Sequence, residues 1–365
     1  MHLVLFFTGG ISLKTWDTFG MFDRETAIYK RLQEHGVKIS FITYGDRTDL
    51  YYADRLPGIR ILCNRWGLPK QIYRRLLPIL YAPALVRANV YKTNQMNGAI
   101  VAARAARLWH KPLITRCGYM WSEFIAREDG DSPWIHKIRK IEEKIFSRSR
   151  HIIVTTSMMK DDLVKRVLAA GQRTVVIPNY VLTDYFKPQE KQKDFDLVFV
   201  GRLSRQKNIS SLLEAVSCMQ CTLLLIGTEE KGQSFRDQIK KSKSVLWVEK
   251  VPHAKLPEEI NRAKIFILPS LYEGHPKTLI EAMSCGMAVI GADSPGIRGI
   301  IRHGENGWLC GTDPDSIQRA VEKLLAEPEL RERLGHNARK FAVDNFSLDR
   351  IVAKELDVIR KCVRN

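Results

Sequence analysis

Short apolar runs recur along the chain, separated by longer stretches in which apolar residues follow a helical period. Runs of this length that are bounded by turn residues are typical of buried strands. Strands that alternate with helices favour an α/β protein. The expected strands are His2–Phe7, Val37–Thr43, Ile59–Cys63, Val90–Thr93, Pro112–Thr115, His151–Thr156, Thr174–Ile177, Phe195–Val200, Thr222–Ile226, Val245–Val248, Ile265–Leu268 and Ala288–Ala292.

The length of the chain bounds the number of domains. A chain of 365 residues, 45% of them hydrophobic, is too long for one ordinary core and fits two globular domains. Residues 178–193 are rich in Pro and charge and are expected to connect the two. We therefore expect a first domain over residues 1–180, a second over residues 181–345, and a terminal helical segment over residues 346–365.

Two carboxylates, Glu273 and Glu281, flank the start of a predicted helix. A loop follows the strand Ile265–Leu268, and the helix is expected to run from Lys277 until Gly286 ends it as a C-terminal cap. Glu273 then lies on the loop, and Glu281 lies just inside the helix. The first N–H groups of the helix, which have no partner within it, lie between the two carboxylates.

This arrangement suits a phosphate flanked by hydroxyl groups. A helix N-terminus carries about half a positive charge and offers N–H donors, here those of Lys277, Thr278 and Leu279. Carboxylates accept hydrogen bonds from hydroxyls, so a phosphate between two sets of hydroxyls describes a sugar nucleotide. The alternative is that Glu281 stabilises the first helical turn and Glu273 is a solvated loop charge. For two carboxylates at an arbitrary spacing, that alternative is favoured.

The residues around the two glutamates resemble the signature of the retaining family 4 glycosyltransferases. The hallmark of that family is a pair of glutamates with seven residues between them, as in Glu273 and Glu281. The resemblance covers nearly all of residues 174–345 and is loose in the N-terminal half. The segments that carry it are Pro269–Ile290 with the two glutamates, Val200–Asn208 as the diphosphate loop, Ile177–Asn179 as the end of an interdomain strand, and Gly304–Trp308 as a late turn.

The resemblance implies the GT-B fold, in which two Rossmann-like, doubly wound α/β domains face a cleft. It implies that the first domain binds the acceptor and that the second binds the sugar-nucleotide donor. It also implies that the last helix, about Leu348–Val363, crosses back onto the first domain.

The same resemblance assigns roles to individual residues. Glu273 would hold hydroxyls of the donor sugar and Glu281 the ribose, while Arg202, Lys207 and the helix start at Lys277 would neutralise the diphosphate. Because these groups stabilise the leaving diphosphate, no metal and no other cofactor is expected. The remaining residues expected at the donor site are Gly9, Gly10, Gly201, Val251 through its backbone, Gly274, Thr278 and Leu279.

One departure from the family pattern lies in the loop expected after the strand Pro112–Thr115. Many members carry a histidine there that touches the transferred sugar, whereas Arg116 and Tyr119 occupy the place in this chain. Ligands of an α/β sheet bind beyond the carboxyl ends of its strands, so we expect Arg116 to take part in transfer. The departure leaves the sugar and the acceptor open.

The formal net charge is +18, and no acidic residue occurs between Asp54 and Glu123. A basic surface of this kind attracts nucleic acid, anionic lipid or an acidic glycan; the alternative is a basic but solvated surface. Residues 71–81 interleave apolar and basic side chains and can lie on an anionic membrane, although Pro78 and Pro83 disfavour a long straight helix. No nucleic-acid motif is present, so nucleic acid is not an expected partner.

The apolar run Leu3–Phe7 is too short for a signal peptide, and no run approaches the roughly 18 apolar residues of a membrane span. We expect a cytoplasmic protein, or one bound peripherally to the cytosolic face of a membrane.

The leading hypothesis is a retaining, metal-independent transfer of a sugar from a UDP- or GDP-sugar to a hydroxyl of a glycan or lipid-linked acceptor. Such an acceptor, which a basic first domain suggests is anionic, points to cell-envelope polysaccharide or lipopolysaccharide synthesis. Retention comes from the family resemblance alone. Two alternatives stay open: a sugar-nucleotide epimerase or hydrolase on the same fold, which needs an acid/base set near the anomeric carbon, and a non-catalytic basic binding protein.

Overall fold

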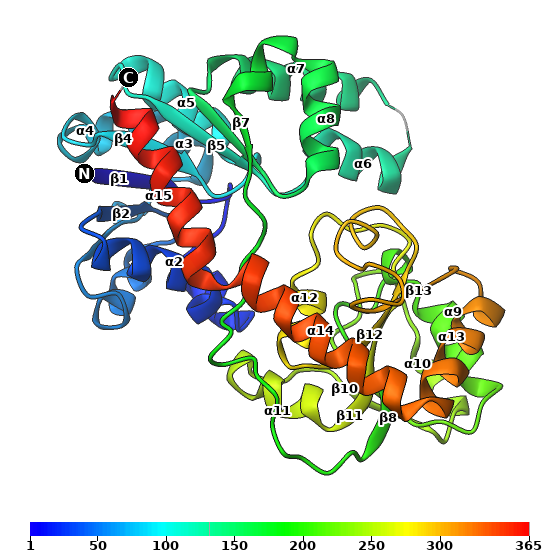
Figure 1. Ribbon diagram of the computed structural model, residues 1–365. Coiled ribbons are helices and arrows are strands. Elements are labelled where there is room, and N and C mark those ends of the chain that lie inside the picture. The colour runs from blue at the N-terminus through cyan, green and yellow to red at the C-terminus, as the bar shows by residue number, and fades with distance from the viewer. Residues whose placement is uncertain (131, 365) are drawn as a thin grey trace. The chain divides into compact units, whose positions relative to one another are not determined.

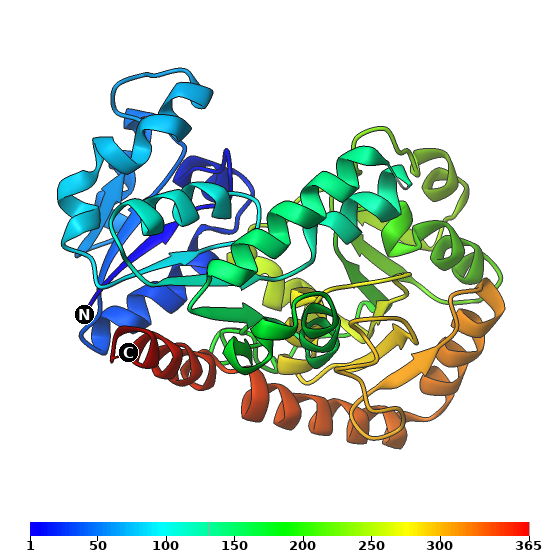
Figure 2. The same ribbon diagram turned by 90° about the horizontal axis from the view of Figure 1, so that it is seen from above.

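The structure, a computed structural model, describes residues 1–130 and 132–364, which form two compact units (Figure 1). Unit 1 comprises Met1–Pro178 together with the C-terminal segment from Ile351, and unit 2 comprises Asn179–Arg350. Each unit is built around one parallel sheet, and helices cover both faces of each sheet (Figures 1 and 2). The α/β class expected from the apolar runs is therefore confirmed.

The sheet of unit 1 has seven strands in the order β3-β2-β1-β4-β5-β6-β7, and all of its pairings are parallel. The strands are β1 (His2–Phe6), β2 (Lys38–Ile42), β3 (Ile59–Leu62), β4 (Val90–Thr93), β5 (Leu113–Cys117), β6 (His151–Val154) and β7 (Thr174–Val176). The helices are α1 (Leu13–Thr18), α2 (Phe22–Glu34), η1 (Arg47–Arg55), α3 (Lys70–Leu80), α4 (Ala82–Val86), α5 (Ala99–Leu108), α6 (Trp121–Asp129), α7 (Pro133–Arg148), α8 (Ser157–Arg166), η2 (Leu168–Arg173) and, from Ile351 on, α15 (Leu348–Arg364).

The sheet of unit 2 has six parallel strands in the order β10-β9-β8-β11-β12-β13. The strands are β8 (Phe195–Val200), β9 (Leu223–Ile226), β10 (Val245–Val248), β11 (Ala263–Leu268), β12 (Ala288–Ala292) and β13 (Trp308–Cys310). The helices are η3 (Arg205–Lys207), α9 (Ile209–Ser217), α10 (Arg236–Lys241), η4 (His253–Lys255), α11 (Leu256–Asn261), α12 (Lys277–Ser284), α13 (Pro314–Ala326) and α14 (Pro328–Phe346).

The central strands of both sheets are buried on both faces, which is why they appear in the sequence as continuous apolar runs. In β1 the side chains of Leu3, Val4, Leu5 and Phe6 are all fully buried. The short edge strand β13 was not predicted, because its three residues form no distinct run. The expected break near the two prolines is present, since α3 ends at Leu80 and α4 begins at Ala82.

In both sheets the strand order reverses beside the first strand of the unit. β1 lies between β2 and β4, and β8 lies between β9 and β11. In open parallel sheets, ligands bind beyond the carboxyl ends of the strands at such a reversal. The segments that follow β8 and β11 in unit 2, and β1 and β4 in unit 1, are therefore the places where a site is expected.

Among the helices of the described residues, none has both the length and the apolar character that crossing a membrane requires.

Candidate active site

The loop that carries Glu273 is fixed by backbone contacts on both sides. It follows β11, and the N–H of Leu271 donates to the carbonyl of Gln206 over 2.9 Å. The side-chain amide of Gln206 donates to the carbonyl of Tyr272, also over 2.9 Å. On the other side, the N–H of Glu273 donates to the carbonyl of Pro295 over 2.9 Å. The loop after β11 is thus joined to the loops after β8 and β12.

Lys207 and Glu273 form an ion pair at this edge of the sheet. Lys207 Nζ lies 2.5 Å from Glu273 Oε1, and both side chains are largely buried. The sequence assigned the two residues to different parts of a ligand, and the structure brings them together. An ammonium group has three donors and a carboxylate about four acceptor sites, so the pair keeps capacity for a phosphate oxygen on one member and a hydroxyl on the other.

The helix α12 begins directly after this loop. The helix starts at Lys277, as expected, and Pro276 is its N-cap; no side chain of the described residues caps it. The amide of Asn179 donates to the carbonyl of His275 over 2.7 Å and so supports the entry into the helix. This role of Asn179 was not predicted from the sequence. Thr278 is half-buried, and Leu279 packs its side chain in the core of unit 2, which leaves its backbone as the group for a ligand.

Glu281 is almost fully buried, and its Oε1 lies 3.2 Å from Nε2 of His253. His253 belongs to η4, at the end of the loop of residues 249–253, and its ring lies 5.2 Å from that of Phe186. The family resemblance implies that this loop holds the nucleotide base, and we call it the base loop. Val251 in the same loop is partly buried against the core of unit 2. The structure therefore joins the base loop to the second glutamate through His253, a residue that the sequence did not single out.

Arg202 lies two residues after the end of β8, and its Nη1 lies 2.9 Å from Oε1 of Glu230. More than half of the Arg202 side chain is exposed, and an exposed pair of this kind is worth only about 0.2–1 kcal/mol. A phosphate can therefore replace Glu230 as the partner of Arg202 with little loss of free energy. Behind it the ends of β8 and β9 approach closely, because Gly227 has φ +146° and a Cβ there would lie 1.8 Å from the carbonyl oxygen of Gly201.

A second glycine holds the position of Glu273. Gly296 has φ +85°, and a Cβ at this residue would lie 2.3 Å from the carbonyl oxygen of Glu273 and 2.6 Å from that of Gly274. Only glycine fits such an approach without strain. The sequence showed a loop here but gave no sign that it packs on the glutamate loop.

We expect Gly296→Ala to destabilise unit 2 by about 2 kcal/mol or more and to lower kcat/KM at least about tenfold, because the added methyl displaces the Glu273 loop. Gly299→Ala is the matched control, since a Cβ at that glycine would meet no atom within 4 Å and its φ is not positive. Thermal denaturation and steady-state kinetics of both variants check the prediction. Equal behaviour of the two variants would show that the close approach has no effect on the site.

The glycine pair of unit 1 lies at the carboxyl end of β1, as expected. The N–H of Gly9 donates to the carbonyl of Asn97 over 2.9 Å, and Gly10 has φ +83°. Gly98 has φ +110°, and a Cβ there would lie 2.8 Å from the nitrogen of Gly9. Gly9 and Gly98 thus allow the segments after β1 and β4 to pack closely, and the proximity of Gly9 and Gly10 to a donor diphosphate stays a prediction.

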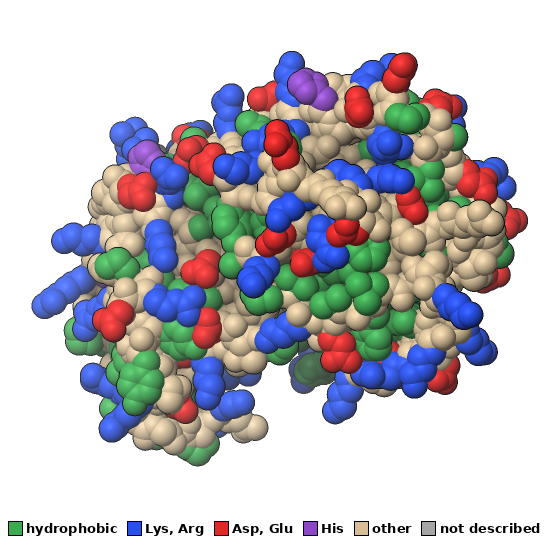
Figure 3. Space-filling view, turned by 90° about the horizontal axis from the view of Figure 1, so that it is seen from below, with side chains coloured by type: hydrophobic (Ala, Val, Ile, Leu, Met, Phe, Trp, Pro, Cys, Tyr) green, Lys and Arg blue, Asp and Glu red, His purple; other side chains and the backbone are tan. Residues whose placement is uncertain are grey.

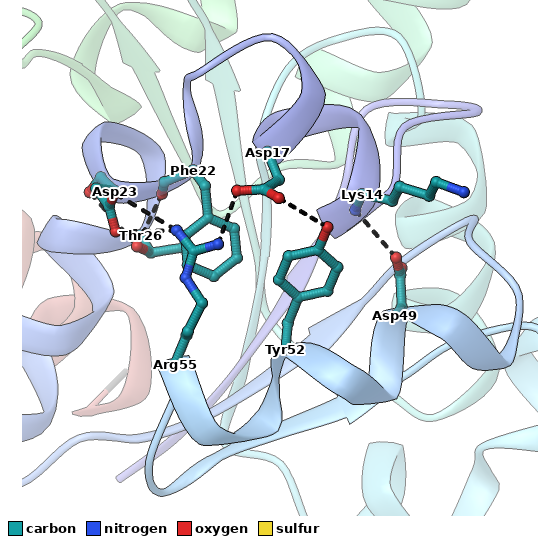
Figure 4. A network of polar contacts seen from close by, with 8 residues as sticks. All are labelled: Lys14, Asp17, Phe22, Asp23, Thr26, Asp49, Tyr52 and Arg55. Carbon is teal, nitrogen blue, oxygen red and sulfur yellow. Dashed lines mark hydrogen bonds and ion pairs between the residues drawn. The ribbon is translucent and has the colours of Figure 1, made fainter. Parts of the chain in front are cut away.

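A polar network fixes the segment that follows this glycine pair (Figure 4). Arg55 Nη1 in η1 lies 2.7 Å from Oδ1 of Asp17 in α1, and the hydroxyl of Tyr52 donates to Oδ2 of Asp17 over 3.1 Å. The buried carboxylate of Asp49 accepts from the N–H of Lys14 over 3.2 Å. Burial raises the pKa of Asp49. Together these contacts join α1 to η1.

Arg116 does not lie in an exit loop, and that part of the sequence prediction is wrong. It belongs to β5 and pairs with Ile153 of β6. Its Nη1 lies 3.5 Å from Oε1 of Glu355 in α15, which allows a charged side chain in a buried strand. Tyr119 follows the strand and is exposed. A role of Arg116 in transfer stays a prediction.

Within the described residues, no group of three or more His, Cys, Asp or Glu side chains is placed to hold a metal ion. Three Asp-x-Asp spacings occur in the chain. In one of them, Asp194 forms an ion pair with Arg262 and Asp196 forms one with Lys264. Asp313 of the pair Asp313 and Asp315 accepts from the N–H of Ser316 over 2.8 Å and caps α13. The third pair is Asp129 and Asp131, and Asp131 lies outside the described residues.

Two parallel α/β units, with a last helix that returns to the first unit, define the GT-B fold of glycosyltransferases. The sequence profile described as Glycosyl transferases group 1 matches residues 182–341, and the profile described as Glycosyltransferase Family 4 matches residues 26–185. The chain belongs to the family 4 glycosyltransferases, as its two-glutamate motif predicted.

Individual relatives are distant. The chain is 26% identical over 253 residues to an alpha-maltose-1-phosphate synthase of Mycolicibacterium smegmatis, and the alignment covers 60% of this chain and 65% of the relative. It is 24% identical, over an alignment of 384 positions, to a D-inositol 3-phosphate glycosyltransferase of Catenulispora acidiphila, and this alignment covers 93% of this chain and 89% of the relative. The solved structure of Anabaena Alr3699/HepE in complex with UDP and glucose superposes with a TM-score of 0.79 at 15% identity, over 99% of this chain and 100% of the other.

Proposed function

We propose that the protein transfers a sugar from a nucleotide diphosphate sugar, with UDP or GDP as the nucleotide, to a hydroxyl of a glycan or lipid-linked acceptor. The observation that carries the proposal is the Lys207–Glu273 pair, which lies at the carboxyl ends of β8 and β11 and beside the start of α12. It combines a cation for the diphosphate with an acceptor for sugar hydroxyls at a reversal of strand order. The UDP and glucose in the Anabaena structure support a nucleotide-linked donor.

In the proposed reaction the bond between the anomeric carbon and the diphosphate oxygen breaks, and a bond forms from that carbon to the acceptor oxygen. The acceptor proton passes to the leaving phosphate oxygen. Lys207, Arg202 and the N-terminus of α12 stabilise the charge that develops on the diphosphate. Glu273 holds hydroxyls of the donor sugar and is not a nucleophile, so attack on the face that the phosphate leaves gives retention of configuration. The chemistry requires no metal at any of these steps.

The acceptor is proposed to be anionic, and the pathway to be one of cell-envelope polysaccharide or lipopolysaccharide synthesis. Two of the relatives carry a phosphorylated sugar or polyol in their names, which supports an acceptor with a phosphate group. The net charge of +18 supports the same choice, because positive charge raises the local concentration of an anionic substrate.

The experiment that tests the proposal is product analysis by proton NMR after incubation with a UDP- or GDP-sugar and phosphorylated sugar acceptors. The account predicts a new glycoside with the anomeric configuration of the donor. Conversion of the donor without an acceptor product would favour an epimerase or hydrolase. Binding of DNA at physiological salt without any turnover would favour the non-catalytic binding protein.

We further propose that the protein binds the cytosolic face of an anionic membrane through α3. On the face of the molecule in Figure 3, Lys and Arg side chains are spread among Asp and Glu rather than gathered in one patch, so charge alone does not define a binding surface on this face. Helix α3 adds an apolar element. Its side chains Ile72, Leu76 and Ile79 are 45%, 39% and 63% exposed, and their spacing of four and three residues places them on one side of the helix.

The surroundings of α3 are basic and aromatic. Lys70, Arg74 and Arg75 belong to the helix, which contains no acidic residue. At its C-terminal end the ring of Trp66 lies 5.4 Å from that of Tyr81. An exposed apolar row flanked by cations and a tryptophan is typical of a helix that lies in the interface of an anionic bilayer.

We expect the double variant Ile72→Ser/Ile79→Ser to lower the binding to phosphatidylglycerol-containing vesicles at least about tenfold, since each isoleucine loses part of its apolar burial. Leu168→Ser is the matched control, because Leu168 in η2 is 83% exposed but lies on another element. Vesicle flotation checks the prediction. The proposal would be overturned by equal floating fractions for the unmodified protein and both variants. Equal floating fractions with and without anionic lipid would also overturn it.

A further inference from the structure

A hollow of about 810 Å³ lies in unit 1 at the amino ends of four neighbouring strands. Its lining includes residues that directly precede β4, β5, β6 and β7, together with the ends of α5, α7 and α15. Strands β4 to β7 are consecutive in the sheet and all parallel, so their amino ends share one edge. This edge is opposite the one at which the glycine pair after β1 lies, so the hollow is separate from the candidate site residues of unit 1.

The hollow is lined by six basic side chains and by no Asp or Glu. The basic residues are Arg107, His110, Lys111, Arg148, Arg150 and Arg173. Among the described residues, no carboxylate forms an ion pair with Arg107, Lys111, Arg148 or Arg150. Arg173 is engaged by the backbone, because its Nη1 donates to the carbonyl of Ser149 over 2.6 Å. Four cations thus face one hollow without a protein counter-charge.

Helix ends account for part of this charge but not for all of it. Cations are favoured near helix C-termini, and α5, α7 and α15 end beside the hollow. Each C-terminus contributes about −0.5 of a charge, so three contribute about −1.5 in total. The lining carries five permanent positive charges, from four Arg and one Lys. The positive charge that the helix ends do not neutralise is available to bind an anionic ligand.

The excess positive charge also acts on a neighbouring side chain. His151 begins β6, next to Arg150. Burial lowers the pKa of His151, and the charges of Arg150 and Lys361 lower it further, while Arg173 raises it through a backbone hydrogen bond and lowers it through its charge. The positive charges around the hollow therefore lie close enough together to act on the same side chain.

We propose that this hollow binds a compact anion with two or more phosphate groups. Guanidinium groups bind phosphate oxygens through paired N–H donors, and three of the permanent cations that lack a carboxylate partner are arginines. The phosphates can belong to a soluble diphosphate or to lipid headgroups at a bilayer surface. The site is independent of the proposed donor site in unit 2, and its failure leaves the proposed sugar transfer untouched.

The test is isothermal titration of the full chain with inorganic pyrophosphate at low ionic strength, in a Lys207→Ala background that weakens binding of diphosphate to unit 2. Arg148→Gln/Arg150→Gln removes two exposed cations of the hollow. Lys140→Gln/Lys144→Gln removes the same charge from exposed residues of α7 that do not line the hollow. We expect the first pair to weaken pyrophosphate binding at least tenfold and the control pair less than twofold.

A second arm separates the two sources of phosphate. The same variants are floated with phosphatidylcholine vesicles, with and without phosphatidic acid, while α3 is left intact. A specific loss of flotation in Arg148→Gln/Arg150→Gln, with weak pyrophosphate binding throughout, supports the site and assigns it to lipid headgroups. If the hollow variant equals its charge-matched control in both arms, the proposal is overturned.

Discussion

Replacing Glu273 by Gln is expected to lower kcat/KM for sugar transfer about 30-fold or more. The substitution keeps the shape of the side chain but removes its charge, so sugar hydroxyls lose a charged acceptor and Lys207, 2.5 Å away, loses its counter-ion. Hydrogen bonds to charged groups contribute about 1.5–3 kcal/mol, and 2 kcal/mol corresponds to about 30-fold in rate. Steady-state kinetics with the cognate donor measure the effect.

The control for Glu273→Gln is Glu258→Gln. Glu258 of α11 also forms a glutamate–lysine pair, with Lys191 over 2.7 Å, but both side chains are well exposed. We expect that variant to keep its activity, because exposed pairs contribute little. If Glu273→Gln stays within about threefold of the unmodified protein, roughly 0.7 kcal/mol, the assignment of Glu273 to the donor sugar fails.

Glu355→Ala is expected to destabilise unit 1 by about 3–5 kcal/mol. Glu355 Oε2 lies 2.7 Å from Nζ of Lys92 in β4, and the side chains of Glu355 and Lys92 are 0% and 1% exposed. Removing the carboxylate leaves a buried ammonium without a partner, a change that costs this much in measured cases. Burial already lowers the pKa of Lys92. The expected fall in melting temperature is about 10 °C for a unit of this size.

Two further variants show whether the effect arises from the buried charge. Lys92→Met/Glu355→Leu removes both charges and is expected to recover most of the lost stability, because the pair is replaced by apolar contacts. Asp357→Ala, which breaks the exposed Lys361–Asp357 pair of the same helix, is expected to cost less than about 1 kcal/mol. A Glu355→Ala variant as stable as Asp357→Ala would contradict the account of how α15 is held in unit 1.

The strands were predictable from the sequence because parallel strands are buried on both faces and so appear as apolar runs. The prediction failed where a charge belongs to the buried sheet. Arg116 ended the expected strand, yet it continues β5 because Glu355 receives its guanidinium. Glu355 lies 239 residues further along the chain than Arg116, and no local sequence pattern predicts their contact.

The sequence indicated which elements carry the candidate site residues of unit 2, but it did not indicate the contacts between those residues. The motif placed Glu273 and Lys207 at the ends of two strands, but the ion pair between them depends on β8 and β11 being neighbours. The support of His275 by Asn179, and the approach of Gly296 to Glu273, depend in the same way on tertiary packing. The local sequence signal in these loops was the presence of Pro and Gly. These residues predict turns, but they do not predict which residues pack against the turns.

The most direct test of the central claim, that unit 2 binds a nucleotide diphosphate sugar at the Lys207–Glu273 pair, is a thermal denaturation panel with nucleotides and sugar nucleotides. A ligand at 100 times its dissociation constant adds about 2.7 kcal/mol of stability. The account predicts a clear rise in melting temperature with one nucleotide diphosphate sugar, lost in Lys207→Ala/Glu273→Gln and retained in Glu258→Gln. A rise that persists undiminished in the double variant, or no rise with any member of the panel, would contradict it.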